Sequence, residues 1–144
     1  MRQTCVMDRT GKCLCGAVVL LAKDIDPKAS ACHCGMCLRW AGGPWIGVPA
    51  KELVFGDDDA VGVVQSSAWA ERGFCQRCGS GLFYRVTAEG KHQGMTSVSL
   101  GLLDDTSGIT ITKEWFIDKK PDAYALEGDR ERFTEAEVLA MFGG

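Results

Sequence analysis

The sequence predicts a mostly β domain with little helix, and three observations lead to this prediction. Strand-length runs rich in valine, isoleucine, threonine and aromatic residues recur along the chain, and glycine, proline or aspartate bounds many of them. The 18 glycines are scattered, which suits tight turns between short strands. A convincing helical pattern is found at the end of the chain. We therefore expect an antiparallel β-sheet domain with a short C-terminal helix.

Seven short segments account for the predicted sheet. The apolar run over residues 17–22 has the length of a strand and is too short for a transmembrane helix. The other segments share its richness in β-branched and aromatic residues. The predicted strands cover residues 18–22, 45–48, 61–65, 82–86, 96–100, 109–112 and 115–117.

The predicted C-terminal helix has a start signal, an apolar face and a stop signal. Thr134 can cap its first turn, and Glu137 completes a capping box three residues later. Val138, Leu139 and Phe142 give the apolar face, and a glycine at position 143 ends the helix.

Length and charge limit the class of protein. A chain of 144 residues suits a single domain over residues 1–144, with its core at about residues 11–126. The net charge of −3 and the pI near 5.4 argue against nucleic-acid or anionic-membrane partners, which need a basic surface. Residues 1–9 have no apolar region of the signal-peptide type. We expect a cytoplasmic protein, whose clustered cysteines are metal ligands or catalytic groups rather than disulfides.

Two cysteine pairs have the spacing of one closed metal site. Cys13 and Cys15 are two residues apart and precede Gly16, whereas Cys75 and Cys78 enclose a turn. Both side chains of a Cys-x-Cys on an extended strand lie on one face, and a Cys-x-x-Cys turn aims two sulfurs at one point. Zinc takes four such ligands in a tetrahedron. The sequence therefore predicts a structural zinc site made by these four cysteines.

The middle cysteines form a different group. Cys32, Cys34 and Cys37 lie within six residues, with a short helical turn expected after Cys34. Three protein ligands and a vacant position are typical of a catalytic zinc, and a zinc with three thiolates suits binding of a further thiolate. The alternatives are a second structural site, completed by His33 or Cys5, and a redox cluster. On a strand His33 points away from its two neighbours, so we expect it to support the site rather than to bind the metal. We expect no role for Cys5.

Three motifs make the chain resemble the glutathione-dependent formaldehyde-activating enzyme family, which has the Mss4-like, zinc-pinned β fold. The resemblance runs from Gly11 to about Leu126. Its most specific elements are Gly-Lys-Cys-Leu-Cys-Gly over residues 11–16, Cys-His-Cys-Gly-Met-Cys-Leu-Arg-Trp over residues 32–40 and Phe-Cys-Gln-Arg-Cys-Gly-Ser over residues 74–80.

The resemblance implies two zinc ions per chain, a structural one on the outer pairs and a catalytic one on Cys32, Cys34 and Cys37. It further implies a carbon–sulfur lyase that adds glutathione, a small-molecule thiol, to formaldehyde. The chain departs from related sequences at two places, where Glu114 begins an aromatic strand and where Ala123 and Tyr124 follow a Lys-Pro-Asp stretch.

A few other residues are candidates for binding. Arg39 can hold a glutathione carboxylate as a bidentate fork, and Trp40 flanks the same site in sequence. We expect the remaining tryptophans in the core or in a pocket wall. We expect solvated loops at the aspartate runs 57–59 and 104–105 and at the histidine at position 92.

Two other functions are consistent with the same cysteines. The first is a non-catalytic zinc-stabilised binding or chaperone-like module, because fold alone does not determine function. The second is a thiol redox enzyme, which needs a reactive cysteine away from the metal, and Cys5 is poorly placed for that role.

Overall fold

The computed structural model describes residues 7–142 of the chain. Within them the backbone contacts define two compact units, the first made of residues 7–27 and 47–108 and the second of residues 28–46 and 109–142. The mostly β class is confirmed, whereas the single domain over residues 1–144 stays a prediction. No helix among the described residues combines the length and apolar character needed to cross a membrane.

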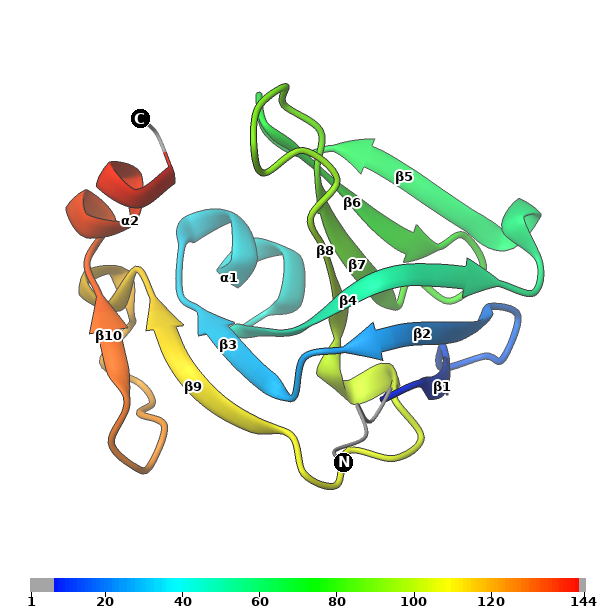
Figure 1. The fold of residues 1–144 in the computed structure, drawn as a ribbon, viewed down its shortest axis with the longest axis horizontal. Coiled ribbons are helices and arrows are strands. Elements are labelled where there is room, and N and C mark those ends of the chain that lie inside the picture. Colours follow the sequence, from blue (N-terminus) through cyan, green and yellow to red (C-terminus); the bar gives the residue numbers. More distant parts are fainter. Residues whose placement is uncertain (1–6, 143–144) are drawn as a thin grey trace, which may run out of the picture. The chain divides into compact units, whose positions relative to one another are not determined.

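The strands of the first unit pair antiparallel, in the order β1-β2-β4-β8-β7-β6-β5 (Figure 1). Five predicted strands overlap strands of this unit, and the prediction for residues 61–65 matches β5 at both ends. The elements are β1 (Arg9–Lys12), β2 (Val19–Ile25), β4 (Trp45–Phe55), which enters the unit at Gly47, η1 (Asp58–Ala60), β5 (Val61–Gln65), β6 (Ala70–Cys75), β7 (Gly81–Val86), β8 (Thr96–Ser99) and η2 (Leu100–Leu102).

In the core of the first unit, a phenylalanine ring packs directly against a glycine. Gly73 on β6 lies opposite Phe83 on β7, whose ring is almost fully buried. A Cβ atom at Gly73 would lie 2.1 Å from Cε2 of Phe83, so the ring takes the space that any side chain would need. The fully buried residues of the first unit also include Val18, Ala22, Val48, Ala70, Leu82 and Val98.

Parallel pairing distinguishes the strands of the second unit. Strand β9 (Thr110–Trp115) pairs with β3 (Lys28–Cys32) and with β10 (Glu131–Phe133), parallel to both. The arrows of the three strands accordingly point the same way in Figure 1. The expectation of antiparallel pairing is therefore wrong for this unit. Parallel strands need a long connection, and residues 33–109 and 116–130 supply the two connections.

The end of β9 also differs from the prediction. Residues 115–117 were expected as a strand, but β9 ends at Trp115 and Phe116 takes a left-handed conformation with φ of 59°. This turns the chain into η3 (Ile117–Lys119). The indole of Trp115 is half-buried and stacks on the ring of Phe133, with 5.1 Å between the centroids. Trp69, in contrast, is 47% exposed, so it is not a core residue, and its alternative position in a pocket wall stays a prediction.

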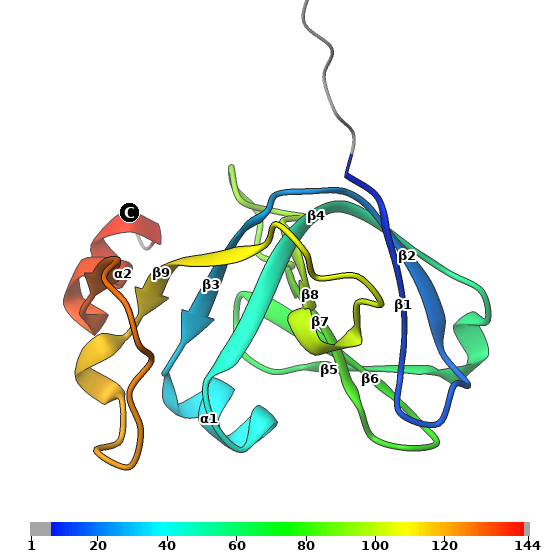
Figure 2. The ribbon, with the colours of Figure 1, turned by 90° about the horizontal axis from the view of Figure 1, so that it is seen from below.

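Two helices complete the second unit. Helix α1 (Gly35–Ala41) follows directly on β3, as both views show (Figure 1, Figure 2). Helix α2 (Glu135–Phe142) begins with the predicted capping box, because Thr134 Oγ1 accepts from the N–H of Glu137 and the Thr134 N–H donates to the Glu137 carboxylate. Of its expected apolar face only Val138 is buried, and the predicted stop at position 143 lies outside the described residues.

Candidate metal centres

The first unit brings the outer cysteine pairs together. Cys13 and Cys15 lie in the turn between β1 and β2, Cys75 ends β6, and Cys78 lies in the turn before β7. We call these residues the four-cysteine cluster. The sulfurs of Cys13 and Cys15 converge through a turn rather than through the strand periodicity that the sequence suggested. That turn is closed by hydrogen bonds from the Cys13 N–H to the Val18 carbonyl and from the Gly16 N–H to the Cys13 carbonyl.

The geometry of the four-cysteine cluster fits a tetrahedral metal. All four sulfurs lie within 4.8 Å of one another. The sulfur of Cys15 is 3.7 Å from that of Cys13 and 3.8 Å from that of Cys75. Metal–sulfur bonds near 2.3 Å put the sulfurs of a tetrahedral site about 3.8 Å apart. Gly79, with φ of 80°, reverses the chain after Cys78.

Hydrogen bonds prepare some of these thiols for ionisation. The Ser80 hydroxyl, 3.1 Å from the sulfur of Cys78, lowers the pKa of Cys78 to about 5. Burial acts to raise the pKa of Cys13, but the Val18 N–H 3.3 Å away and the sulfurs of Cys75 and Cys15 lower it. The Ala17 N–H acts to lower the pKa of Cys15, yet desolvation and the other sulfurs raise it to about 11. Four adjacent thiolates thus need a bound cation.

The second unit builds the middle group, which we call the three-cysteine cluster. Cys32 is the last residue of β3, Cys34 caps the N-terminus of α1, and Cys37 lies in its first turn. The sulfur of Cys34 accepts the Cys37 N–H at 3.3 Å, so the expected helical turn is confirmed and holds two of the ligands. The three sulfurs lie within 4.8 Å of one another.

The three-cysteine cluster has three ligands in the described chain. Within residues 7–142 no further histidine, cysteine or carboxylate joins the group, and Cys5 lies outside the described residues. Cys34 and Cys37 are buried and Cys32 is half-buried. The contacts with Cys32 and Cys37 lower the pKa of Cys34 to about 2, while the contacts with Cys34 and Cys37 raise the pKa of Cys32. An all-sulfur donor set of this kind fits zinc or another thiophilic cation.

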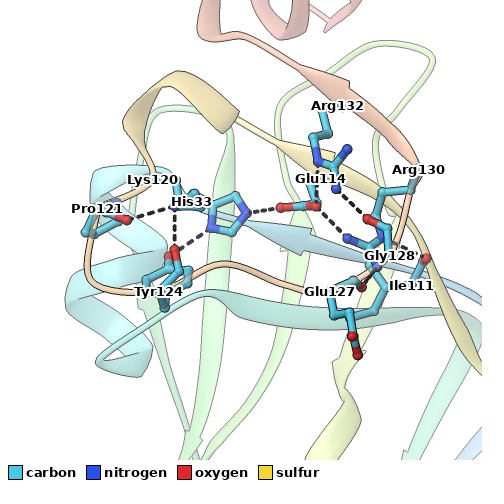
Figure 3. Close-up of polar contacts among 10 residues, drawn as sticks. All are labelled: His33, Ile111, Glu114, Lys120, Pro121, Tyr124, Glu127, Gly128, Arg130 and Arg132. Carbon is cyan, nitrogen blue, oxygen red and sulfur yellow. Dashed lines mark hydrogen bonds and ion pairs between the residues drawn. The ribbon is translucent and has the colours of Figure 1, made fainter.

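His33 is excluded from the cluster by its own contacts. Its ring is fully buried and points to Glu114 of β9 and to Tyr124, as Figure 3 shows. The distances are 2.8 Å from Nε2 to the Glu114 carboxylate and 2.8 Å from Nδ1 to the Tyr124 hydroxyl. The carboxylate of Glu114 also accepts from Arg130 at 2.6 Å and from Arg132 at 3.0 Å. We call these five residues the Glu114 network.

With both clusters in place, comparison with known proteins decides the family. Residues 8–119 match the family described as glutathione-dependent formaldehyde-activating enzyme. The chain belongs to this family. It is also 34% identical over 130 residues to a protein of Schizosaccharomyces pombe named as an uncharacterized lyase, and the match covers 90% of this chain and 93% of the yeast protein.

The match to the formaldehyde-activating family includes both clusters but only part of the Glu114 network. Residues 13–78, which contain every cluster cysteine, and Glu114 lie inside the matched range. Tyr124, Arg130 and Arg132 lie beyond it. These three residues were not singled out as site residues from the sequence, because nothing in their spacing relates them to His33. Glu114 itself offered a signal, because the chain departs from related sequences at this position.

The remaining candidate residues belong neither to the two cysteine clusters nor to the Glu114 network. Arg39 is exposed and Trp40 half-buried in the second half of α1, and their binding of substrate stays a prediction. Both aspartate runs are exposed, but only residues 104–105 lie in a loop as expected, where Asp105 accepts from the N–H and hydroxyl of Ser107. Residues 57–59 instead cap and begin η1. The histidine at position 92 lies in the turn between β7 and β8.

Proposed function

We propose that this protein is a zinc-dependent carbon–sulfur lyase that binds glutathione or a related thiol at the three-cysteine cluster and adds it to formaldehyde or a small carbonyl. The proposal rests on one observation above all, the convergence of three sulfurs with no fourth ligand among residues 7–142. Membership of the formaldehyde-activating family and the similarity to a yeast protein named as a lyase support the reaction class.

The proposal includes two zinc ions per chain with different tasks. The four-cysteine cluster supplies a complete tetrahedral set, which leaves no position for a substrate, so its zinc would stabilise the first unit. The three-cysteine cluster would hold the second zinc through Cys32, Cys34 and Cys37 and leave one position open. The proposed compartment is the cytoplasm, whose reducing conditions keep cysteines available to metals.

The proposed reaction is the addition of a thiol to a carbonyl group, and its reverse is the lyase reaction. A bond forms between the thiol sulfur and the carbonyl carbon, the carbon–oxygen double bond becomes single, and the thiol proton ends on the oxygen. The product from formaldehyde is a hydroxymethyl thioether, and cleavage of its carbon–sulfur bond is the reverse. A zinc ion bound by thiolates lowers the pKa of a further thiol, so that the nucleophile is available at neutral pH.

The side chains of this protein would bind and orient the thiol. Cys34 and Cys37 are buried and Cys32 is half-buried, so the protein shields much of the cluster from water. Arg39 on α1 is the proposed partner of a glutathione carboxylate, since a guanidinium binds a carboxylate through two parallel hydrogen bonds. Orientation of the two reactants would supply much of the acceleration.

Exchange spectroscopy tests the proposed reaction. Nuclear magnetic resonance measures the rate at which glutathione and formaldehyde interconvert with their adduct, with and without the zinc-loaded protein. We expect faster exchange with the wild type and no acceleration with Cys34→Ser. Ser107→Ala, which changes a loop serine of the first unit, is the matched control and should behave as the wild type. Exchange at the buffer rate with the wild type would overturn the enzyme and favour a binding module.

A further inference from the structure

The imidazole of His33 is held at both nitrogens although it binds no metal in the proposed site. It lies between Cys32 and Cys34 in the chain, and its backbone N–H donates to the Trp115 carbonyl at 3.0 Å. Its side chain is fully buried and contacts Glu114 and Tyr124 at 2.8 Å each (Figure 3). Burying a polar group costs free energy unless the group is hydrogen-bonded, so the two contacts of this buried ring need a physical explanation.

The parallel strands of the second unit bring Glu114 and its partners to His33. In β9, Glu114 is in register with Ala31 of β3 on one side and with Arg132 of β10 on the other. Arg130 precedes β10, donates to the same carboxylate oxygen as Arg132 and also donates to the Ile111 carbonyl at 3.2 Å. The other carboxylate oxygen faces His33.

The two arginines determine which nitrogen of His33 carries a proton. Burial acts to raise the pKa of Glu114, but the hydrogen bonds from Arg130, His33 and Arg132 outweigh it and hold the pKa below its usual value. The carboxylate is therefore ionised near neutral pH and can only accept hydrogen bonds. Nε2 of His33 must donate to it, and in the neutral ring Nδ1 then accepts the proton of Tyr124.

Tyr124 is itself held in place as the donor to Nδ1. Burial and the charges of Glu114 and Cys32 raise the pKa of Tyr124, so its hydroxyl keeps the proton. The ammonium group of Lys120 contacts the Tyr124 carbonyl and lies 5.3 Å from the centre of its ring. The ring of His33 thus cannot rotate without breaking a hydrogen bond at each nitrogen.

From these contacts we infer that Glu114 and Tyr124 are positioning residues of the three-cysteine cluster, and that they act by fixing the tautomer and orientation of His33. Because His33 joins the last residue of β3 to the cap of α1, holding its ring holds the peptide segment that aims two of the three sulfurs. The inference rests on the proposed metal site, and it extends that site to Glu114, inside the range matched by the family, and to Tyr124, beyond that range.

The first test reads the tautomer of His33 directly. Long-range proton–nitrogen correlation distinguishes the protonated from the unprotonated ring nitrogen, and the chain has only two histidines to assign. We expect protonation at Nε2 in the wild type. In Glu114→Gln the amide oxygen must accept from the arginines and its NH₂ group faces His33, so the proton should move to Nδ1. Protonation at Nδ1 in the wild type, or an unchanged tautomer in the variant, would overturn the inference.

The second test measures zinc affinity at each cluster by competition with a chelator. We expect Glu114→Gln to weaken binding at the three-cysteine cluster by about 10- to 100-fold, because a neutral amide replaces the charged acceptor of the Nε2 proton. Tyr124→Phe should weaken it less, because the charge-assisted hydrogen bond to Glu114 remains. The four-cysteine cluster, measured alone in a Cys34→Ser background, should keep its affinity when Glu114→Gln is added. Glu135→Gln, which removes the carboxylate of an exposed ion pair in the same unit, should match the wild type.

The outcomes separate this inference from the proposed function. Unchanged affinity at the three-cysteine cluster in Glu114→Gln would overturn the positioning role and leave the enzyme proposal intact. Equal losses at both clusters would also overturn it, because they indicate general destabilisation. A wild type that binds no zinc at the three-cysteine cluster would overturn the proposed function, and the positioning role with it.

Discussion

At the scale of single residues, the groups around each sulfur determine how readily it ionises and binds a metal. Cys78 has a hydroxyl beside it, Cys13 has a backbone N–H, and the sulfur of Cys34 accepts from the amide of Cys37. Each contact favours the thiolate, which is the form that binds metals. The two clusters are therefore prepared by local hydrogen bonds before a metal arrives.

Ser80 makes the clearest prediction of this kind. The pKa of Cys78 is lowered to about 5, first by the Ser80 hydroxyl, so Ser80→Ala should raise it. Protons then compete with zinc at higher pH, and the midpoint of acid-induced zinc release should move upward by about one pH unit. Zinc release followed with a chromogenic chelator measures the midpoint. Ser107→Ala is the control, and an unchanged midpoint in Ser80→Ala would show that the hydroxyl has no such effect.

At the scale of elements, close packing and capping determine what the strands and helices tolerate. Strands β6 and β7 meet at Gly73 and Phe83, where no space remains for a methyl group. Helix α2 is short and buries mainly Val138, so its start depends on the capping box at Thr134 and Glu137. Each element can be tested by one substitution.

A methyl group at Gly73 should destabilise the first unit. In Gly73→Ala the new Cβ would lie 2.1 Å from the Phe83 ring, and overpacking of this kind costs about 1–3 kcal/mol of unfolding free energy. Urea unfolding of the zinc-loaded protein measures the change. Gly101→Ala, where a Cβ would meet no atom within 4 Å, should stay within about 0.5 kcal/mol of the wild type. Equal stability of the two variants would contradict the packing argument.

Removal of the cap should loosen α2 without affecting the clusters. Thr134→Ala leaves the N–H of Glu137 without its acceptor and should cost the helix about 1 kcal/mol. Hydrogen exchange at the α2 amides should therefore become about five-fold faster. Thr106→Ala, in an exposed loop, is the comparison. Unchanged protection in α2 would mean that its start does not depend on the capping box.

At the scale of the whole molecule, the sequence predicted what depends on local spacing and missed what depends on the tertiary arrangement. The cysteine groups were predictable because a turn or a short segment determines where each pair of sulfurs points. The parallel pairing of β3 with β9 was not, since no local pattern records that a connection as long as residues 33–109 returns in the same direction. The Glu114 network follows from that pairing, so its link to His33 escaped the sequence. Trp69 is not the core residue that its size suggested.

The two proposed metal centres would have different tasks, since one would stabilise the fold and the other would bind the substrate thiol. The four-cysteine cluster joins the β1–β2 turn to the end of β6 and the turn that follows it, so metal removal should destabilise the first unit by several kcal/mol. The loss should appear as a large drop in melting temperature after chelation, reversed by zinc. Cys15→Ser should show the low melting temperature even with zinc present, whereas a Cys15→Ser variant as stable as the zinc-loaded wild type would contradict this assignment.

The central claim is that the three-cysteine cluster binds its own metal, and zinc content per chain tests it most directly. Plasma mass spectrometry on zinc-repleted, desalted wild type and Cys34→Ser measures it in parallel. We expect about two zinc ions for the wild type and about one for the variant, since the proposed structural site stays complete. Equal zinc content in the two proteins would show that the three-cysteine cluster does not hold a metal and would contradict the account.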